Sequence, residues 1–187
     1  SIVSGIDDHS RFIVAAHVVE RATGRPVCEA LTNAMRLHGL PQEILTDNGK
    51  VFTGRFGPGK GEVLFDRICR ENGIKHILTA PRSPTTTGKI ERWHRTLRRE
   101  FLNGKVFESI GDAQAQLDGW VHEYNHDRRH QGIGDVVPWE KTHSWPQERF
   151  HRCVDHTAPD FRQSGNEFGF VLPHDPTQLD GLESGCR

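Results

Sequence analysis

The sequence predicts an α/β fold in which a mixed sheet is flanked by helices. Short apolar segments rich in β-branched residues alternate with longer segments in which apolar residues recur at helical spacing, and Gly, Pro, Asn or Asp separate them. The chain of 187 residues is 34% hydrophobic and 26% charged, a balance typical of a rather polar globular protein. This length accommodates one domain and an appendage.

The first elements predict a hairpin followed by alternating helices and strands. Residues 2–6 and 12–19 are apolar and β-branched, and a polar turn at 7–11 separates them, which is typical of two antiparallel strands. The later elements, in chain order, are a helix at 26–37, a strand at 43–46, a helix at 62–71, a strand at 74–79, and helices at 88–102 and 110–125.

Periodicity fades beyond Trp145, so we expect residues 1–145 to form the folded core and residues 146–187 an irregular polar tail. The four cysteines are far apart and form no C-x-x-C pair, which favours buried free thiols over a zinc site. No apolar run approaches the roughly 20 residues of a membrane span, and the first residues lack the layout of a signal peptide. We therefore expect a cytoplasmic protein with no membrane partner.

Two acidic positions have a local interpretation and a functional one. Asp47 follows a short apolar strand and begins an Asp-Asn-Gly sequence, which alone is typical of a turn. Strand ends in α/β sheets, however, are where sites are built. Glu91, Arg95 and Arg98 share one helix face, which alone describes a solvated surface with an internal ion pair. Together they suggest a carboxylate site beside a basic ridge.

Four motifs, in order, resemble those of the DDE transposases of bacterial insertion sequences and of retroviral integrases. Residues 44–52 and 83–97 resemble the second and third acidic motifs of that family. Residues 5–12 resemble its second-strand motif, and residues 124–134 with Pro138-Trp139-Glu140 resemble its closing signature. The likeness covers roughly residues 2–142.

The resemblance implies an RNase H-like integrase catalytic core, in which three acidic residues hold two divalent cations, Mg2+ or Mn2+. Asp47 would be the second acidic residue and Glu91 the third. Such cations prefer carboxylate oxygens, and a pair of them supports in-line phosphodiester displacement. The implied function is DNA integration and transposition by metal-dependent phosphodiester cleavage and strand transfer.

The resemblance also implies partners. It places Lys89, Arg95 and Arg98 where family members hold DNA near the metals, and guanidinium groups suit phosphate contacts that fix register without reading sequence. The DNA would comprise transposon ends and target. The complete protein is expected to form a homo-oligomer.

The sequence departs from the family pattern at its beginning. In the family the first catalytic Asp lies on a first strand, upstream of the motif that residues 7–11 resemble, whereas almost nothing precedes that motif here. Asp7 and Asp8 belong to the second strand and the hairpin turn, so they are poor substitutes. We therefore expect an N-terminally truncated core that lacks its first strand and is catalytically inactive alone.

Two alternatives remain open. Another nuclease of the same fold, such as a ribonuclease H or a Holliday-junction nuclease, would share the carboxylates but not the signatures at 89–97 and 124–138. A non-catalytic nucleic-acid-binding or interaction remnant of a transposase would keep the basic helix. Its DNA affinity would fall steeply with salt and be indifferent to Asp47→Asn.

Overall fold

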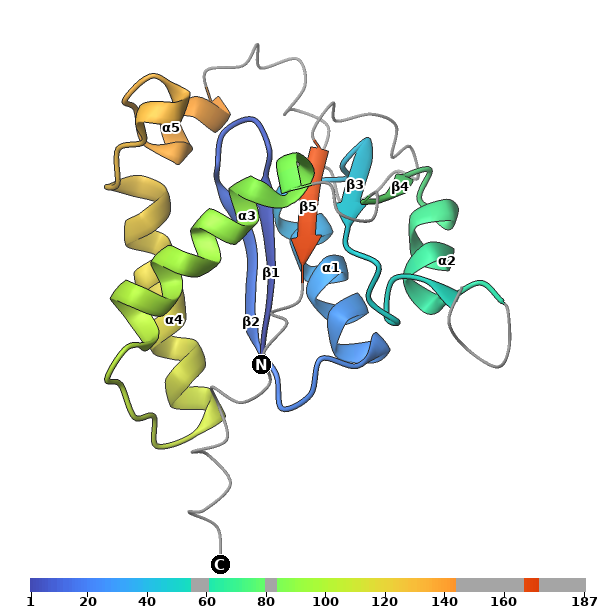
Figure 1. Ribbon diagram of the computed structural model, residues 1–187, viewed down its shortest axis with the longest axis horizontal. Coiled ribbons are helices and arrows are strands. Elements are labelled where there is room, and N and C mark those ends of the chain that lie inside the picture. The colour runs from blue at the N-terminus through green and yellow to red at the C-terminus, as the bar shows by residue number, and fades with distance from the viewer. Residues whose placement is uncertain (55–60, 80–83, 144–166, 172–187) are drawn as a thin grey trace, which may run out of the picture.

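The computed structural model of the chain describes residues 1–54, 61–79, 84–143 and 167–171 (Figure 1). Its elements in chain order are β1 (Ile2–Asp7), β2 (Ile13–Val18), α1 (Gly24–His38), β3 (Glu43–Thr46), α2 (Leu64–Glu71), β4 (Lys75–Leu78), α3 (Pro84–Leu97), a π-helix (Arg98–Leu102), α4 (Ile110–His126), a 3-10 helix (Gln131–Ile133), α5 (Pro138–His143) and β5 (Glu167–Val171).

The elements predicted between residues 2 and 126 are all present, with small shifts at their ends. The largest shift is at α3, which begins at Pro84, four residues before the predicted start. Proline is well suited to the first turn of a helix because its missing N–H would have no partner there. The predicted helix 88–102 therefore continues as α3 followed by one turn of π-helix.

The five strands form one mixed sheet in the order β2-β1-β5-β3-β4. β1 is antiparallel to β2 and to β5, whereas β3 is parallel to β5 and to β4. Figure 1 shows β5 lying between β1 and β3. A strand from the far end of the chain thus joins the N-terminal hairpin to the rest of the sheet.

From the sequence we expected a core without its first strand and an irregular tail. The structure instead has a strand from that tail between β1 and β3. The position between β1 and β3 is filled by residues 167–171, which lie within the predicted tail. The segment reads Glu-Phe-Gly-Phe-Val, and aromatic and β-branched residues favour strands. Its five residues were too few to show a period among polar neighbours. The rest of residues 146–187 lies outside the described part of the chain.

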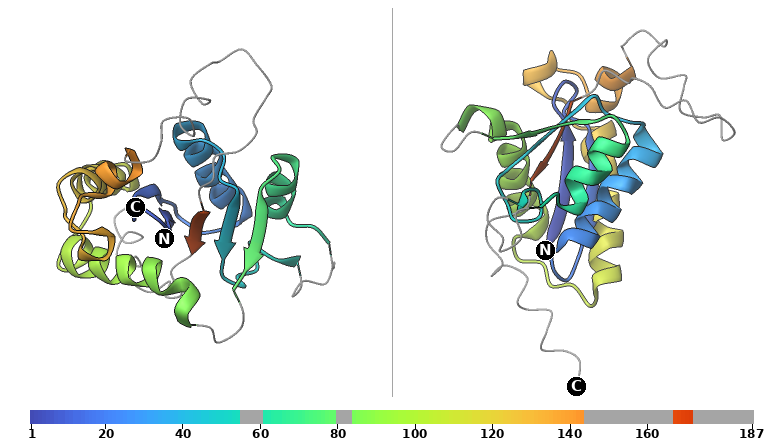
Figure 2. Two further views of the ribbon diagram at one scale, coloured as in Figure 1. Left: turned by 90° about the horizontal axis from the view of Figure 1, so that it is seen from above. Right: turned by 90° about the vertical axis from the view of Figure 1, so that its right-hand side faces the viewer.

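Two hydrophobic cores lie on opposite faces of the sheet, because successive strand residues point to opposite sides. Val3 of β1 joins the core beneath α1 and α2, whereas Ile2 and Ile6 join the core beneath α3 and α4. Figure 2 shows α1 and α2 on one side of the sheet and α3 on the other. Large members of the first core are Val27, Leu31, Ile44, Phe52 and Phe65, and those of the second are Ile90, Trp93, Leu97, Phe101 and Leu117.

The outer edge of β2 is covered by two side-chain amides of α4. Asn125 accepts from the Ile13 N–H at 2.8 Å and donates to the Ile13 carbonyl at 3.1 Å. Gln114 accepts from the Val18 N–H at 2.7 Å and donates to the Ala16 carbonyl at 2.9 Å. These amides satisfy backbone groups that an open edge strand would leave unpaired. They also fix α4 along the strand.

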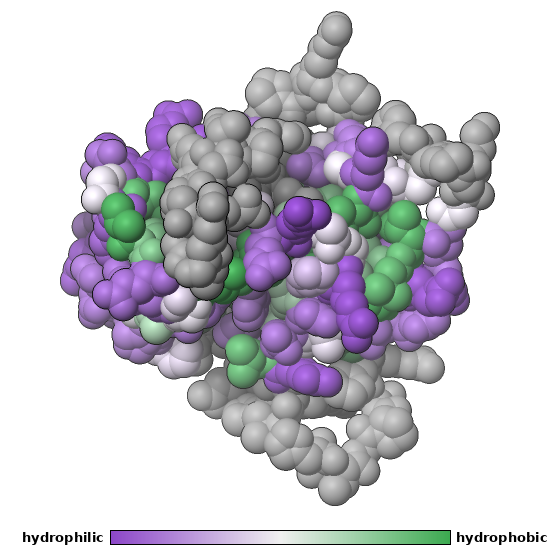
Figure 3. Space-filling view, turned by 90° about the horizontal axis from the view of Figure 1, so that it is seen from below, coloured by the Kyte–Doolittle hydropathy of each residue, from purple (hydrophilic) through white to green (hydrophobic). Residues whose placement is uncertain are grey.

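The surface of the described residues is mainly polar. On the face seen in Figure 3, hydrophilic residues predominate and hydrophobic residues appear in small groups between them. Among the described helices, none combines the length and apolar character that crossing a membrane requires. Cys28 and Cys69 are buried free thiols, as predicted, and burial raises the pKa of Cys69 to about 12. Cys153 and Cys186 lie outside the described residues.

The amide cover of β2 predicts that Asn125→Ala destabilises the fold by about 1–3 kcal/mol, because it leaves two buried backbone groups of Ile13 without partners. Urea unfolding measures the change. Gln116→Ala is the matched control, since Gln116 lies on the exposed side of α4 and its bonds, to Asp112 and from Lys105, are both exposed; it should cost less than about 0.5 kcal/mol. Equal effects of the two substitutions would contradict the role of Asn125.

Candidate metal and nucleic-acid site

Asp47 stands directly after β3 and is largely buried, with 8% of its surface exposed. Its Oδ1 atom accepts the backbone N–H of Gly49 at 2.8 Å. A Cβ atom at position 49 would lie 2.8 Å from the same oxygen, closer than such contacts occur. The Asp-Asn-Gly sequence is therefore a turn whose glycine makes room for the aspartate side chain.

Alternation along β3 decides which side of the sheet Asp47 faces. Ile44 belongs to the core beneath α1 and α2, and Thr46, two residues later, bonds His76 on that same side. Because successive residues alternate, Asp47 is directed to the opposite side, which α3 covers. α3 is the helix that contains Glu91.

Three positions on neighbouring strands line up at this level of the sheet. Ser4 of β1 is paired with Val171 of β5, and Phe170 is paired with Thr46, so Val171 and Asp47 are each one residue further on. We call positions 4, 171 and 47 the cross-strand row. Ser4 is fully buried and its Oγ lies 2.6 Å from Nε2 of His94 on α3. Ser4, at one end of the row, therefore faces the α3 side.

Two polar contacts, on either side of Glu91 in sequence, connect α3 to β1 and to the turn that follows it. His94 bonds Ser4, and Lys89 forms an ion pair with Asp8 and also donates to its carbonyl at 3.3 Å. Ile90 and Trp93 are buried against the sheet, while Glu91 is exposed. The structure thus places Asp47 and the helix that carries Glu91 on one side of the sheet.

The three basic residues predicted to contact DNA differ in their surroundings. Lys89 is about 39% exposed and is engaged by Asp8. Arg95 and Arg98 are exposed and line a surface pocket of about 480 Å3 together with Arg99. Among the described residues, neither Arg95 nor Arg98 has an ion-pair partner within 4.0 Å. Their guanidinium groups are thus exposed to solvent.

Asp7 and Asp8 lie near the other end of the sheet from Asp47. Asp7 is paired with Phe168, three residues before Val171. Its Oδ2 atom accepts the N–H of Ser10 at 2.8 Å and the Ser10 hydroxyl. Asp7 therefore closes the hairpin turn, and Asp8 forms an ion pair with Lys89.

Similarity to known proteins agrees with this arrangement. Two family models, both described as the integrase core domain, match residues 2–84 and 72–138, and together they span the hairpin, Asp47 and α3. The chain belongs to the integrase core domain family. It is 30% identical over 135 residues to a protein of insertion element IS407 from Burkholderia multivorans, which covers 72% of this chain and 46% of that protein.

Solved integrase structures show the same fold. The HTLV-2 integrase catalytic core domain in complex with magnesium aligns with a TM-score of 0.53 at 19% identity, covering 75% of this chain and 83% of that one. The catalytic core of BIV integrase aligns with a TM-score of 0.55 at 22% identity, covering 73% and 81%. This integrase core is thus RNase H-like. The chain spans less than half the length of the curated relatives it matches, 46% and 33% for the first two.

The closing signature of this integrase core has a structural role. Tyr124 and Asn125 are buried, and Asn125 bonds the edge of β2. Arg128 donates to both carboxylate oxygens of Glu100 on the π-helix, at 2.5 and 3.0 Å. Its guanidinium carbon lies 5.5 Å from the centre of the Tyr124 ring. The signature therefore holds the end of α4 against the π-helix that follows α3.

The sequence did not single out four residues that surround the acidic positions. These are Ser4 and His94 on the α3 side, and Thr46 and His76 on the α2 side. Ser4 and Thr46 lie within predicted apolar strands, where a lone hydroxyl gives little signal. A polar residue at a buried strand position, with a histidine on a neighbouring element, is the pattern that would have found them.

The Glu100–Arg128 pair predicts a specific dependence of stability on pH. Hydrogen bonds from Arg128, and then from Arg99, lower the pKa of Glu100 from 4.5 to about 2. A carboxyl with a lowered folded-state pKa contributes stability above pH 4.5, and this contribution is lost as the pH falls toward 2. Glu100→Gln should therefore make the free energy of unfolding fall less steeply between these values.

Urea unfolding of the integrase core at several pH values measures this slope. Glu29→Gln is the matched control, because within the described part of the chain the ion pair of Glu29 is an exposed one with Arg25, and it should leave the slope nearly unchanged. A slope for Glu100→Gln equal to that of the unsubstituted chain would contradict the assignment.

Proposed function

We propose that this chain is the catalytic core of a transposase or integrase, whose chemistry is metal-dependent phosphodiester cleavage and strand transfer in DNA integration and transposition. The observation that carries the proposal is the direction of Asp47 toward the α3 side, where Glu91 and the exposed Arg95 and Arg98 lie along one helix. We further propose that the chain alone is catalytically inactive.

Asp47 and Glu91 are suited to hold Mg2+ or Mn2+, because these hard cations prefer carboxylate oxygens. A related integrase core has been solved in complex with magnesium, which supports the same cofactor class here. When bound, the cations would activate a water or 3′-hydroxyl nucleophile and neutralise the leaving oxygen. The chain's own contribution is to fix Asp47 at the end of β3 and Glu91 on α3, which Lys89 and His94 tie to β1.

Inactivity follows from the sequence of the central strand. A third carboxylate would have to come from the cross-strand row, between Ser4 and Asp47, and that position is Val171. The one acidic residue of β5 is Glu167, which is paired with Glu43 at the other end of β3. Two like-charged carboxylates without the third provide too few ligands for a pair of cations.

DNA is the proposed partner, bound through Arg95 and Arg98. Both are exposed beyond Glu91 on the same helix and line one pocket, where guanidinium groups can contact successive phosphates. A homo-oligomer is proposed for the complete protein, since the HTLV-2 core has been solved in dimeric and trimeric forms.

The second candidate function is a non-catalytic DNA-binding or interaction fragment of a transposase. Val171 in the cross-strand row favours it as the role of this chain by itself. The two candidates share Arg95 and Arg98 but differ at Asp47. Metal binding that depends on Asp47 supports the catalytic ancestry, whereas DNA binding indifferent to Asp47 supports the fragment.

The incomplete site predicts a gain of function. Position 171 stands between Ser4 and Asp47 in the register of the sheet, so Val171→Asp would add a carboxylate to the cross-strand row next to position 47. We expect Mn2+ to bind at least about tenfold more tightly than to the unsubstituted chain, since carboxylate number tunes affinity. Electron paramagnetic resonance of free Mn2+ measures the dissociation constant.

Val171→Asn is the matched control, because asparagine has the same shape as aspartate but no charge. The double substitution Val171→Asp with Asp47→Asn should lose the gain. Circular dichroism establishes that each variant is folded. Equal Mn2+ affinity for the Asp and Asn variants would overturn the proposed position of the site.

The affinity for DNA, and its dependence on salt concentration, should depend on Arg95 and Arg98. Arg95→Ala and Arg98→Ala should weaken binding to all sequences alike and reduce the slope of log affinity against log salt by about one each. Lys89→Ala should have a smaller effect, because Asp8 already engages that ammonium group. Fluorescence anisotropy of a labelled duplex measures both quantities.

The control for DNA binding is Arg36→Ala, which removes an exposed arginine from α1 on the other side of the sheet. Its affinity and salt slope should match those of the unsubstituted chain. If Arg36→Ala lost DNA binding while Arg95→Ala and Arg98→Ala kept it, the proposed DNA surface would be on the wrong face of the sheet.

A further inference from the structure

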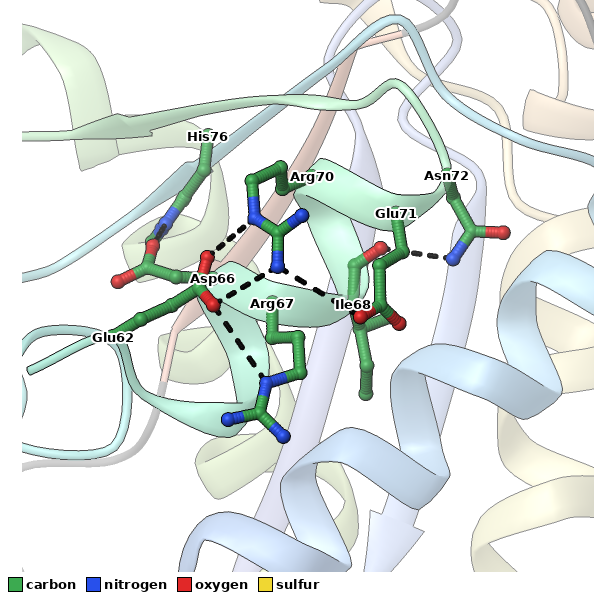
Figure 4. A network of polar contacts seen from close by, with 8 residues as sticks. All are labelled: Glu62, Asp66, Arg67, Ile68, Arg70, Glu71, Asn72 and His76. Atoms are coloured by element: carbon green, nitrogen blue, oxygen red, sulfur yellow. Dashed lines mark hydrogen bonds and ion pairs between the residues drawn. The ribbon is translucent and has the colours of Figure 1, made fainter.

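A chain of polar side chains crosses three elements on the side of the sheet away from α3. His76 of β4 lies with Nε2 2.7 Å from Oγ1 of Thr46 on β3, and with Nδ1 2.5 Å from Oδ1 of Asp66 on α2. Thr46 is fully buried and the His76 side chain is 8% exposed. Figure 4 shows Asp66 and His76 directed toward one another.

Both ring nitrogens of His76 therefore have partners, as a buried imidazole requires. A carboxylate at Nδ1 favours a proton on that nitrogen and fixes the orientation of the ring. The ring also packs on buried Phe65, with 5.0 Å between ring centres. The histidine is thus held in one orientation from two sides.

The environment of Asp66 keeps its carboxylate directed at the histidine. Glu62, which precedes α2, pairs with the two arginines of that helix: its Oε1 lies 2.7 Å from Nε of Arg70 and its Oε2 3.6 Å from Nε of Arg67 (Figure 4). Hydrogen bonds from Arg70 are the main cause of the lowered pKa of Glu62. Among the described residues, the ion pair of Asp66 is with His76.

The other end of this chain meets the backbone of Asp47. The Thr46 hydroxyl donates to the carbonyl oxygen of Asp47 at 3.1 Å. Because a hydroxyl has a single proton, its contact with His76 is then one in which Nε2 donates to Oγ1. The Thr46 carbonyl accepts from Thr79, and the Asn48 side chain donates to the Thr79 carbonyl at 2.8 Å. The backbone at Asp47 is therefore fixed from the α2 side, while its carboxylate is directed to the α3 side.

We propose that Asp66, His76 and Thr46 are positioning residues that preset the carboxylate of Asp47 for a divalent cation. The proposal rests on the proposed function only in taking Asp47 as a metal ligand. A valine at position 46 would fill the same volume without needing a polar partner on β4 or α2. The hydroxyl, the imidazole and the carboxylate together restrain the peptide that carries Asp47, and a merely apolar contact would not.

The first test reads the position of Asp47 without any metal. The Gly49 N–H donates to the Asp47 carboxylate, so its hydrogen exchange reports how firmly that carboxylate is held. Thr46→Val should raise the exchange rate of this amide about tenfold relative to the amides of α4, and Thr46→Ser, which keeps the hydroxyl, should restore it. Asp66→Asn should also raise the exchange rate of the Gly49 amide. The Asp66 side chain is 35% exposed, so this substitution disturbs the buried core less than a change at Thr46.

The matched control is Thr32→Val. The Thr32 hydroxyl donates to the Cys28 carbonyl at 2.8 Å within α1, so this substitution removes a comparable bond away from the acidic site. It should leave the Gly49 exchange rate unchanged. An unchanged Gly49 rate in both Thr46→Val and Asp66→Asn, with circular dichroism showing both folded, overturns the positioning role.

The second test separates this inference from the proposed function. In the Val171→Asp chain, Thr46→Val should weaken Mn2+ binding several-fold, and Thr46→Ser should not. If Thr46→Val speeds Gly49 exchange but Asp47→Asn leaves Mn2+ binding unchanged, the metal site is refuted and the restraint on Asp47 stands. If Thr46→Val leaves Gly49 exchange slow but Asp47→Asn abolishes Mn2+ binding, the restraint is refuted and the metal site stands.

Discussion

The sheet depends on a strand between β1 and β3, because each of them has a row of backbone N–H and C=O groups that needs partners on that side. β5 supplies those partners on both sides, antiparallel to one neighbour and parallel to the other. Without it, the N-terminal hairpin and the β3–β4 pair would share no backbone pairing. The same pairing sets Ser4 and Asp47 at one level of the sheet. The central strand therefore determines both the stability of the fold and the geometry of the acidic site.

Hydrophobic packing and polar contacts have different effects on the position of α3. Burial of residues such as Ile90, Trp93 and Leu97 contributes about 1.5–3 kcal/mol each, whereas a hydrogen bond contributes about 1 kcal/mol net. Hydrophobic burial therefore holds α3 on the sheet, and it tolerates sliding. The contacts of His94 with Ser4 and of Lys89 with Asp8 have directional geometry, so they fix where along β1 the helix lies. Glu91, between them in sequence, takes its position from both.

The sequence predicted the fold wherever periodicity extended over a whole element, as in α1 and α4, and wherever a turn signal bounded a strand, as at Asp47. It also predicted the family, because its motifs are local. The central strand was missed, since a five-residue segment pairs through the backbone and its partners are more than 120 residues away. The bonds to Ser4 and Thr46 were missed for a related reason, because a buried hydroxyl acquires its meaning only from a histidine on another element. The assignments of Asp47, Glu91, Lys89, Arg95 and Arg98 remain predictions.

The central claim is that an integrase core fold is present here with an incomplete set of metal-binding carboxylates. A strand-transfer assay with the purified chain tests it most directly, using a labelled donor duplex whose end has a free 3′-hydroxyl, a target duplex, and Mg2+ or Mn2+. We expect the duplex to be bound and no joined product to form with either cation. Joined product that disappears with Asp47→Asn would show that the chain already has a complete site, and would contradict the claim.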